Sequence, residues 1–297
     1  MSTFGTPRPP IMPTITAPSV TLPNVTVPWI RAQKGHQKLT MLTAYDYPTS
    51  VTLDASGVDL LLVGDSVATV VYGEPNTLSI SMEDMLRHTL AVSRGARRAL
   101  VVGDMPFMSY QVSIEQALTN AGRFLKEGRA QAVKLEGGLE MASTVKALTR
   151  IGIPVIGHIG LTPQSIHMMG SYRMHGKSST ERAFLKEAAL ALSEAGAFAL
   201  VLECVEESLA REISQSLLIP TIGIGSGNGC DGQVLVTQDL VGLTVGHIPK
   251  FVRPLATLGQ DLKAAVTKFI QRTHVPDNIQ LDPVSLGTSG GELASRH

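Results

Sequence analysis

The stretch that decides the fold spans residues 59–66 and reads D-L-L-L-V-G-D-S. An apolar run the length of one buried strand ends abruptly at Gly64, Asp65 and Ser66. An apolar run that ends in a carboxylate returns at three later places: residues 99–104, 132–136 and 198–203. We expect the carboxylates at the ends of these strands to meet in space.

Short apolar segments alternate with longer segments of helical pattern on both sides of this stretch. Strands are predicted at residues 39–44, 59–64, 99–103, 132–136, 154–158, 198–203, 220–224 and 234–237. Helices are predicted at residues 47–56, 81–95, 113–128, 139–150, 180–194, 206–217 and 258–272. Capping-box patterns at Ser81 and Ser113 mark two of the helix starts.

This alternation predicts an α/β protein, a single-domain (β/α)8 TIM barrel whose parallel strands are buried on both faces. An open, doubly wound sheet is the alternative. That sheet would carry a glycine-rich phosphate fingerprint after its first strand, whereas residues 43–46 read T-A-Y-D. The barrel also explains why the carboxylates come from several strands, since barrel active sites lie at the carboxyl ends of the strands.

The two ends of the chain differ from the part between them. Residues 1–36 contain seven prolines and precede the first acidic residue, Asp46. Proline at this density predicts an extended or disordered arm, with a targeting peptide or strand-like docking onto a neighbouring subunit as alternatives. We therefore divide the chain into this arm, a barrel catalytic domain at residues 37–272 and a tail at residues 273–297.

Composition excludes several classes of function. The 297 residues carry no formal net charge, and only 4% of them are aromatic. We therefore expect neither a basic surface for phosphate backbones nor aromatic platforms for nucleic-acid bases. No apolar run approaches the roughly 18 residues of a membrane span. Two cysteines, Cys204 and Cys230, form no disulfide framework and indicate a cytoplasmic protein with reduced thiols.

Three of the predicted strand ends carry oxygen ligands: Asp65, Asp104 and Glu136. Oxygen-only sites suit hard cations, Mg²⁺ first, with other divalent cations as substitutes. Without a cation, three converging carboxylates would repel one another. For any one of them the alternative is an ordinary cap on the helix that follows its strand.

Three further side chains are candidates for contact with a substrate. Ser66 is a helix cap or a substrate contact. Lys134 lies two residues before Glu136 and therefore on the same face of its strand, where we expect it to meet a substrate carboxylate or the acids themselves. A displaced surface lysine is the alternative. His158, at the end of another predicted strand, is a substrate hydrogen-bonding group or a buried structural histidine.

Glu203 is the candidate general base, because a carboxylate at the end of an apolar strand is partly desolvated. The neighbouring Cys204 is a nucleophile or, without an activating histidine at a known spacing, a small core residue. Residues 223–229 read G-I-G-S-G-N-G and form a phosphate-binding loop or simply a tight turn.

Eight segments together resemble the ketopantoate hydroxymethyltransferase family in order and spacing. They are residues 43–47 (TAYDY), 63–66 (VGDS), 104–107 (DMPF), 133–138 (VKLEGG), 157–164 (GHIGLTPQ), 202–205 (LECV), 222–225 (IGIG) and 246–251 (GHIPKF). The resemblance spans residues 37–272 and departs from the family's pattern at residues 170–177 and 226–230.

The resemblance implies a barrel of the phosphoenolpyruvate mutase and isocitrate lyase superfamily that assembles as a homodecamer. It also implies transfer of a hydroxymethyl group from 5,10-methylenetetrahydrofolate to α-ketoisovalerate (3-methyl-2-oxobutanoate), by way of a metal-stabilised enolate, in pantothenate biosynthesis. The implied magnesium ligands are Asp65, Asp104 and Glu136. The implied substrate contacts are Asp65, Ser66, Asp104 and Lys134, and the implied proton acceptor is Glu203.

Two other functions remain as alternatives. One is a C–C lyase or phosphomutase of the same superfamily, acting on another 2-oxo acid through a similar enolate. The strings at residues 134–138 and 160–164 argue against it. The other is a barrel scaffold without catalysis, which is disfavoured because each matched site position keeps a chemically competent residue.

Overall fold

The computed structural model describes residues 23–246 and 248–274. Eight strands form a closed barrel in chain order, each parallel to both of its neighbours. The strands are β1 (Leu39–Thr43), β2 (Leu60–Val63), β3 (Leu100–Asp104), β4 (Ala132–Glu136), β5 (Val155–Gly160), β6 (Ala199–Glu203), β7 (Thr221–Ile224) and β8 (Gly232–Leu235). The predicted TIM barrel is therefore confirmed.

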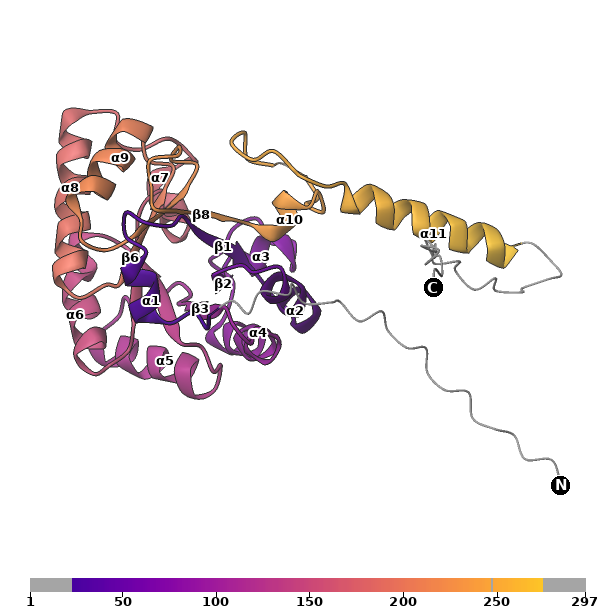
Figure 1. The fold of residues 1–297 in the computed structure, drawn as a ribbon, viewed down its shortest axis with the longest axis horizontal. Coiled ribbons are helices and arrows are strands. Elements are labelled where there is room, and N and C mark those ends of the chain that lie inside the picture. Colours follow the sequence, from indigo (N-terminus) through magenta and orange to yellow (C-terminus); the bar gives the residue numbers. More distant parts are fainter. Residues whose placement is uncertain (1–22, 247, 275–297) are drawn as a thin grey trace, which may run out of the picture.

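Helices pack around the barrel, except the carboxyl-terminal one, which projects away from it (Figure 1). The longer ones are α2 (Tyr47–Ala55), α4 (Met82–Gly95), α5 (Ile114–Lys126), α6 (Ala142–Arg150), α8 (Ser179–Glu194), α9 (Glu207–Ser216) and α11 (Leu258–His274). The shorter ones are α1 (Val27–Ala32), α3 (Val67–Val70), η1 (Leu139–Met141), η2 (Pro163–Ser165), α7 (Ile166–Met169) and α10 (Thr237–Leu240). Ser81 forms the predicted capping box with Asp84 at the start of α4.

Along each strand, successive apolar residues belong alternately to two separate clusters. Leu61, Val101 and Val133 pack with residues of the surrounding helices, whereas their neighbours Leu60 and Leu100 belong to a separate cluster inside the barrel. Successive side chains of a strand point to opposite faces. The inward positions therefore continue up each strand to its carboxyl end, where the polar residues lie.

The last strand begins and ends earlier than expected. The sequence pattern placed it at residues 234–237, but β8 ends at Leu235 and pairs Gly232 with Leu39 of β1. Thr237 instead begins α10 and bonds to the end of β1, where its backbone N–H donates to Thr43 Oγ1 at 3.0 Å. With these bounds β8 pairs with β1 at four positions and closes the barrel.

The amino-terminal arm differs in part from the expectation. Residues 1–22 lie outside the described residues, but α1 is a helix where an extended chain was expected. Pro28 is tolerated because it lies in the first turn, where no backbone N–H is needed. Ile30 is fully buried in the inner cluster, so α1 closes the amino-terminal end of the barrel.

The carboxyl-terminal helix α11 projects away from the barrel (Figure 1) and is exposed along its length. It ends two residues later than predicted, at His274, so the predicted tail begins inside it. Within the described residues, no helix is long and apolar enough to cross a membrane.

Candidate active site

The inward positions of four neighbouring strands bring the predicted polar residues together at one end of the barrel. They are Asp104 on β3, Lys134 and Glu136 on β4, His158 on β5 and Glu203 on β6. Asp104, Lys134, Glu136 and His158 are buried, whereas the side chain of Glu203 keeps 18% of its surface exposed. The predicted convergence of carboxylates is therefore present.

Lys134 is held by the acids around it. Its Nζ lies 2.7 Å from Asp104 Oδ1, 2.8 Å from Asp104 Oδ2 and 3.6 Å from Glu136 Oε1. Burial lowers the pKa of Lys134, but the negative charges of Asp104, Glu136 and Asp65 outweigh burial and raise it. Lys134 is therefore a charged ammonium that meets the acids themselves, one of the two expectations for this residue.

Asp65 follows β2 and joins the same group. Its backbone N–H donates to Asp104 Oδ2 at 3.2 Å, and its Oδ2 accepts from Gln164 Nε2 at 3.0 Å. Burial raises the pKa of Asp65 well above its ordinary value, and the charges of Asp104 and Glu136 add to the rise. The ionised form of Asp65 is therefore disfavoured beside these acids unless a further positive charge is present.

Ser66 is not a helix cap through its side chain. It occupies the N-cap position of α3, yet its hydroxyl makes no capping hydrogen bond. Instead Ser66 Oγ lies 2.8 Å from the hydroxyl of the buried Tyr45. This removes one of the two interpretations of Ser66 and leaves the substrate contact as a prediction.

His158 stands between two carboxylates. Its Nδ1 lies 3.5 Å from Glu136 Oε1, and its Nε2 lies 3.3 Å from Glu203 Oε2. Burial and the charge of Lys134 lower the pKa of His158, but the contacts with Glu136 and Glu203 outweigh them and raise it to about 9. In the described part of the chain neither ring nitrogen has a hydrogen-bond partner, and the protonated ring contacts both carboxylates as ion pairs.

Two residues that the sequence reasoning missed organise the acids. The hydroxyl of Tyr110 donates to Gln164 Oε1 at 2.7 Å and accepts from the backbone N–H of Glu136 at 3.0 Å. The backbone N–H of Gln164 donates to Glu136 Oε2 at 3.0 Å, and its side chain holds Asp65. Gln164 ends the quoted string at residues 157–164, which was the available signal, whereas no pattern marks Tyr110.

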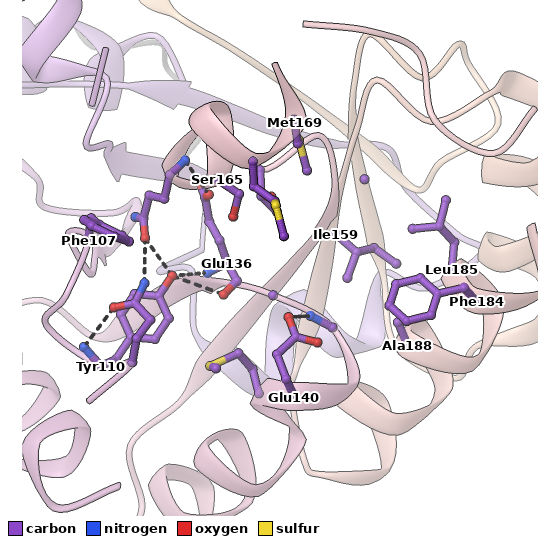
Figure 2. A pocket seen from close by; sticks show the side chains of 18 residues that line it. Phe107, Tyr110, Glu136, Glu140, Ile159, Ser165, Met169, Phe184, Leu185 and Ala188 are labelled. Carbon is purple, nitrogen blue, oxygen red and sulfur yellow. Dashed lines mark hydrogen bonds between the residues drawn. The ribbon is translucent and has the colours of Figure 1, made fainter. Parts of the chain in front are cut away.

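A cavity of about 370 Å³ opens beside Glu136. Figure 2 shows Phe107 and Tyr110 on one side of it, Ile159 and Phe184 on the other, and Glu140 below. Its wall is mostly apolar, and Glu136 belongs both to this wall and to the group of acids.

The residues fit a divalent cation by their chemistry. Asp65, Asp104 and Glu136 offer buried oxygen donors, the set that Mg²⁺ prefers, and a cation would stabilise the ionised form of Asp65 beside the other two. Within the described residues, however, no group of three or more His, Cys, Asp or Glu side chains has the arrangement of a metal site. Lys134 and His158 occupy part of the space around Glu136, and the three-ligand set stays a prediction.

The surroundings of Cys204 and of the glycine-rich loop favour structural roles for both. Burial, with a further contribution from Glu203, raises the pKa of the Cys204 thiol to about 11, which argues against a nucleophile. In the loop, a Cβ on Gly227 would lie 2.4 Å from the side chain of Glu207. Close packing against a carboxylate favours the interpretation as a tight turn over phosphate binding.

Comparison with known proteins assigns the chain to a family. A family model described as ketopantoate hydroxymethyltransferase matches residues 24–276. The chain belongs to the ketopantoate hydroxymethyltransferase family. A relative from Syntrophobacter fumaroxidans, a 3-methyl-2-oxobutanoate hydroxymethyltransferase, is 56% identical over 240 residues, which cover 81% of this chain and 85% of the relative. The protein of the same description from Enterococcus faecalis is 52% identical, over 80% and 86% of the two chains.

Solved structures of other enzymes share the fold of this hydroxymethyltransferase family member. A phosphonopyruvate hydrolase in complex with oxalate and Mg²⁺ superposes with a TM-score of 0.58 at 12% identity, covering 89% of this chain and 92% of that chain. A 2,3-dimethylmalate lyase of the phosphoenolpyruvate mutase and isocitrate lyase superfamily gives a TM-score of 0.55 at 18% identity, covering 86% and 87%. At these identities the likeness concerns the barrel alone.

Proposed function

We propose that this protein is a cytoplasmic enzyme of pantothenate biosynthesis. It transfers a hydroxymethyl group from 5,10-methylenetetrahydrofolate to 3-methyl-2-oxobutanoate, giving ketopantoate. The observation that carries this function is family membership over residues 24–276. The group of acids around Lys134 at the carboxyl ends of the strands supports it, since it supplies side chains of the kind that enolate chemistry requires.

Glu203 is the proposed base. The β-carbon of 3-methyl-2-oxobutanoate carries one hydrogen, and Glu203 accepts it as a proton, which leaves an enolate. The β-carbon then forms a bond to the one-carbon unit carried by the folate. The bonds between this unit and the folate nitrogens break, tetrahydrofolate leaves, and water supplies the hydroxyl oxygen. Partial exposure of Glu203 lets it reach a substrate at the barrel mouth, and His158 fixes the position of its carboxylate.

Asp65, Asp104 and Glu136 would hold the Mg²⁺ or another divalent cation. When bound, the cation supplies Lewis-acid chemistry to the keto and carboxylate oxygens of a 2-oxo acid. Lys134 adds a fixed positive charge beside the same acids, and Gln164 orients Asp65. Together with Ser66, these groups form the proposed binding site of the 2-oxo acid.

Hydrogen–deuterium exchange at the β-carbon tests this function. The protein is incubated with 3-methyl-2-oxobutanoate and Mg²⁺ in D₂O, and the loss of the β-proton is followed by NMR. We expect exchange without folate and formation of ketopantoate when 5,10-methylenetetrahydrofolate is added. Absence of both exchange and product would contradict the proposed function.

The protein is also proposed to assemble into a homodecamer. Support comes from α11, which carries an apolar face that the barrel of its own chain leaves uncovered. A second copy of this chain is the proposed occupant, because every copy carries the same uncovered face. If this face packs against a different surface of the next copy, the contact repeats and closes into a ring.

A further inference from the structure

The cavity beside Glu136 has the walls of a site for a flat ring system. Phe107 and Tyr110 line one side and Ile159 and Phe184 the other (Figure 2), and Met141 also belongs to the wall. Its volume of about 370 Å³ lies in the range of ligand sites, which are largely apolar with a few placed polar groups. The 2-oxo acid finds its partners among the charged groups instead, so the apolar space is free for the second substrate.

One carboxylate is aimed along the lower wall of this cavity. Glu140 Oε1 accepts from the backbone N–H of Gly138 at 2.9 Å, which holds the side chain in place. The described part of the chain gives Glu140 Oε2 no donor. A 2-amino-4-oxopyrimidine ring presents two adjacent N–H donors, and a carboxylate accepts such a pair in bidentate geometry. The ring of a reduced pterin has this edge.

Phe184 lines both this cavity and a second hollow of about 590 Å³. Two cationic side chains line it, Arg173 and Lys177. Arg173 Nη2 lies 3.2 Å from Glu181 Oε1, so its charge is partly balanced there. The side chain of Lys177 adds a cation at the same opening. Positive groups beyond an aromatic residue suit an anionic tail that continues from a flat ring.

We propose that the cavity between Glu136 and Phe184 binds the pterin ring of the one-carbon donor. Glu140 recognises the pyrimidine edge, and the glutamate tail passes Phe184 towards Arg173 and Lys177. Because Glu136 lines both the cavity and the group of acids, a ring bound here brings its one-carbon unit to the 2-oxo acid. This inference rests on the proposed function and names the donor site that the function requires.

Direct binding of tetrahydrofolate, which carries no one-carbon unit, tests the ring site. Isothermal titration calorimetry is run on the full-length protein with Mg²⁺ and on two variants, Glu140→Gln and Phe184→Ala. We expect each variant to bind tetrahydrofolate about tenfold more weakly, which corresponds to about 1.4 kcal/mol. The matched controls on α8, Glu187→Gln and Leu190→Ala, alter exposed side chains outside the cavity and should bind within about twofold of the unchanged protein.

The exchange reaction separates failure of this inference from failure of the function. Exchange at the β-carbon needs no folate, so a variant that exchanges normally is folded and has an intact 2-oxo acid site. A variant that binds tetrahydrofolate weakly but exchanges normally supports the cavity as the site of the pterin ring. If both variants bind tetrahydrofolate like the unchanged protein, the cavity is not the folate site even though the function stands. If the unchanged protein shows neither exchange nor product, the function fails, and the calorimetry still reports on the cavity.

Variation of the tail tests the second hollow. We compare tetrahydropterin without a tail, tetrahydrofolate and its pentaglutamate form. The variant Lys177→Gln should weaken binding of the pentaglutamate form severalfold and leave tetrahydropterin unchanged, whereas Lys146→Gln, on the exposed face of α6, should change neither. An equal loss for all three ligands, or no loss for any, would overturn the placement of the tail.

Discussion

The chemistry of the barrel mouth depends on a balance of charge among a few buried side chains. Lys134 pairs with Asp104 and approaches Glu136, while among the described residues the carboxylate of Asp65 accepts one hydrogen bond, from the amide of Gln164. Burial of Asp65 beside two other acids raises its pKa well above the ordinary value. A cation beside Asp65 would stabilise its ionised form, whereas a second anion without a cation would raise its pKa further.

Replacement of the proposed base tests its role directly. The variant Glu203→Gln keeps the size of the side chain but cannot accept a proton. General bases typically contribute 10²–10⁴ in rate, so we expect β-carbon exchange to slow by about 10³. NMR in D₂O measures the exchange, and calorimetry with Mg²⁺ should show binding close to that of the unchanged protein.

The control for this variant is Glu194→Gln, which alters an exposed carboxylate on α8 away from the acids. It should exchange at the rate of the unchanged protein. If Glu203→Gln also exchanges at that rate, Glu203 is not the base, and another group at the barrel mouth must accept the proton.

The thiol of Cys204 should react slowly although it lies beside the proposed base. With a pKa of about 11, roughly one thiol in a thousand is ionised at pH 8, and the thiolate is the reactive form. We expect alkylation by iodoacetamide at pH 8 to be at least tenfold slower than that of a free cysteine, as followed by mass spectrometry of the Cys204 peptide.

The variant Cys204→Ser completes this test. It should keep the rate of exchange within about twofold, because a small hydroxyl fills the same space. If Cys204→Ser loses exchange and Cys204 of the unchanged protein is alkylated fast, Cys204 acts as a nucleophile after all.

For the side chains of the site, the sequence predicted which ones meet but not which ones hold them in place. Asp104, Lys134, Glu136, His158 and Glu203 could be predicted because strand periodicity places them on inward faces. Tyr110 lies in a loop, and its contact with Glu136 depends on how that loop folds back. Loop conformation has no period in the sequence, so this contact could not be predicted.

Among the elements, one ion pair joins the amino-terminal segment to the connection between β7 and β8. Asp231 accepts from Lys34 Nζ at 2.7 Å, from the backbone N–H of Thr221 at 2.9 Å and from Ser214 Oγ at 3.0 Å. Burial raises the pKa of Asp231, but Lys34 and the hydrogen bond from Thr221 outweigh burial and lower it. Its contribution to stability is therefore present above the unfolded-state pKa of about 4 and is lost as the pH falls below it.

The variant Asp231→Asn should lower the free energy of unfolding by about 1–3 kcal/mol at pH 7. Urea denaturation followed by circular dichroism measures the difference at pH 7 and at pH 3.5. We expect the difference between variant and unchanged protein to shrink at the lower pH. Asp261→Asn, on the exposed helix α11, serves as the control. An equal difference at both values of pH would contradict the role of the Asp231 charge.

The long elements could be predicted from the sequence and the short ones could not. The starts of α2, α4 and α5 follow from capping residues and the strands from their apolar runs. The four-residue helix α3 reads V-A-T-V, a composition typical of strands, and it is too short to show a helical period. It forms because the strand end at Gly64 and Asp65 turns the chain, so tertiary context overrides the local preference.

Over the residues that the structure describes, the long helix α11 does not pack against the barrel of its own chain. β8 is followed by the short helix α10, and the long helix α11 points away from the barrel (Figure 1). The apolar stripe of α11 consists of Leu258, Leu262, Val266, Phe269 and Ile270. These positions recur at helical spacing on one face. Exposed apolar faces of this kind mark sites of association.

The final prediction concerns the assembly of the protein. Light scattering coupled to size exclusion should give the unchanged protein a mass of about ten times its 31.6 kDa. The variant Leu262→Glu/Phe269→Glu places charges in the apolar stripe, where another copy would have to desolvate them, so we expect it to elute as smaller species. Lys263→Gln alters the same helix outside the stripe and should keep the mass of the unchanged protein. A monomeric unchanged protein, or a charged variant of undiminished mass, would show that α11 does not hold copies of the chain together.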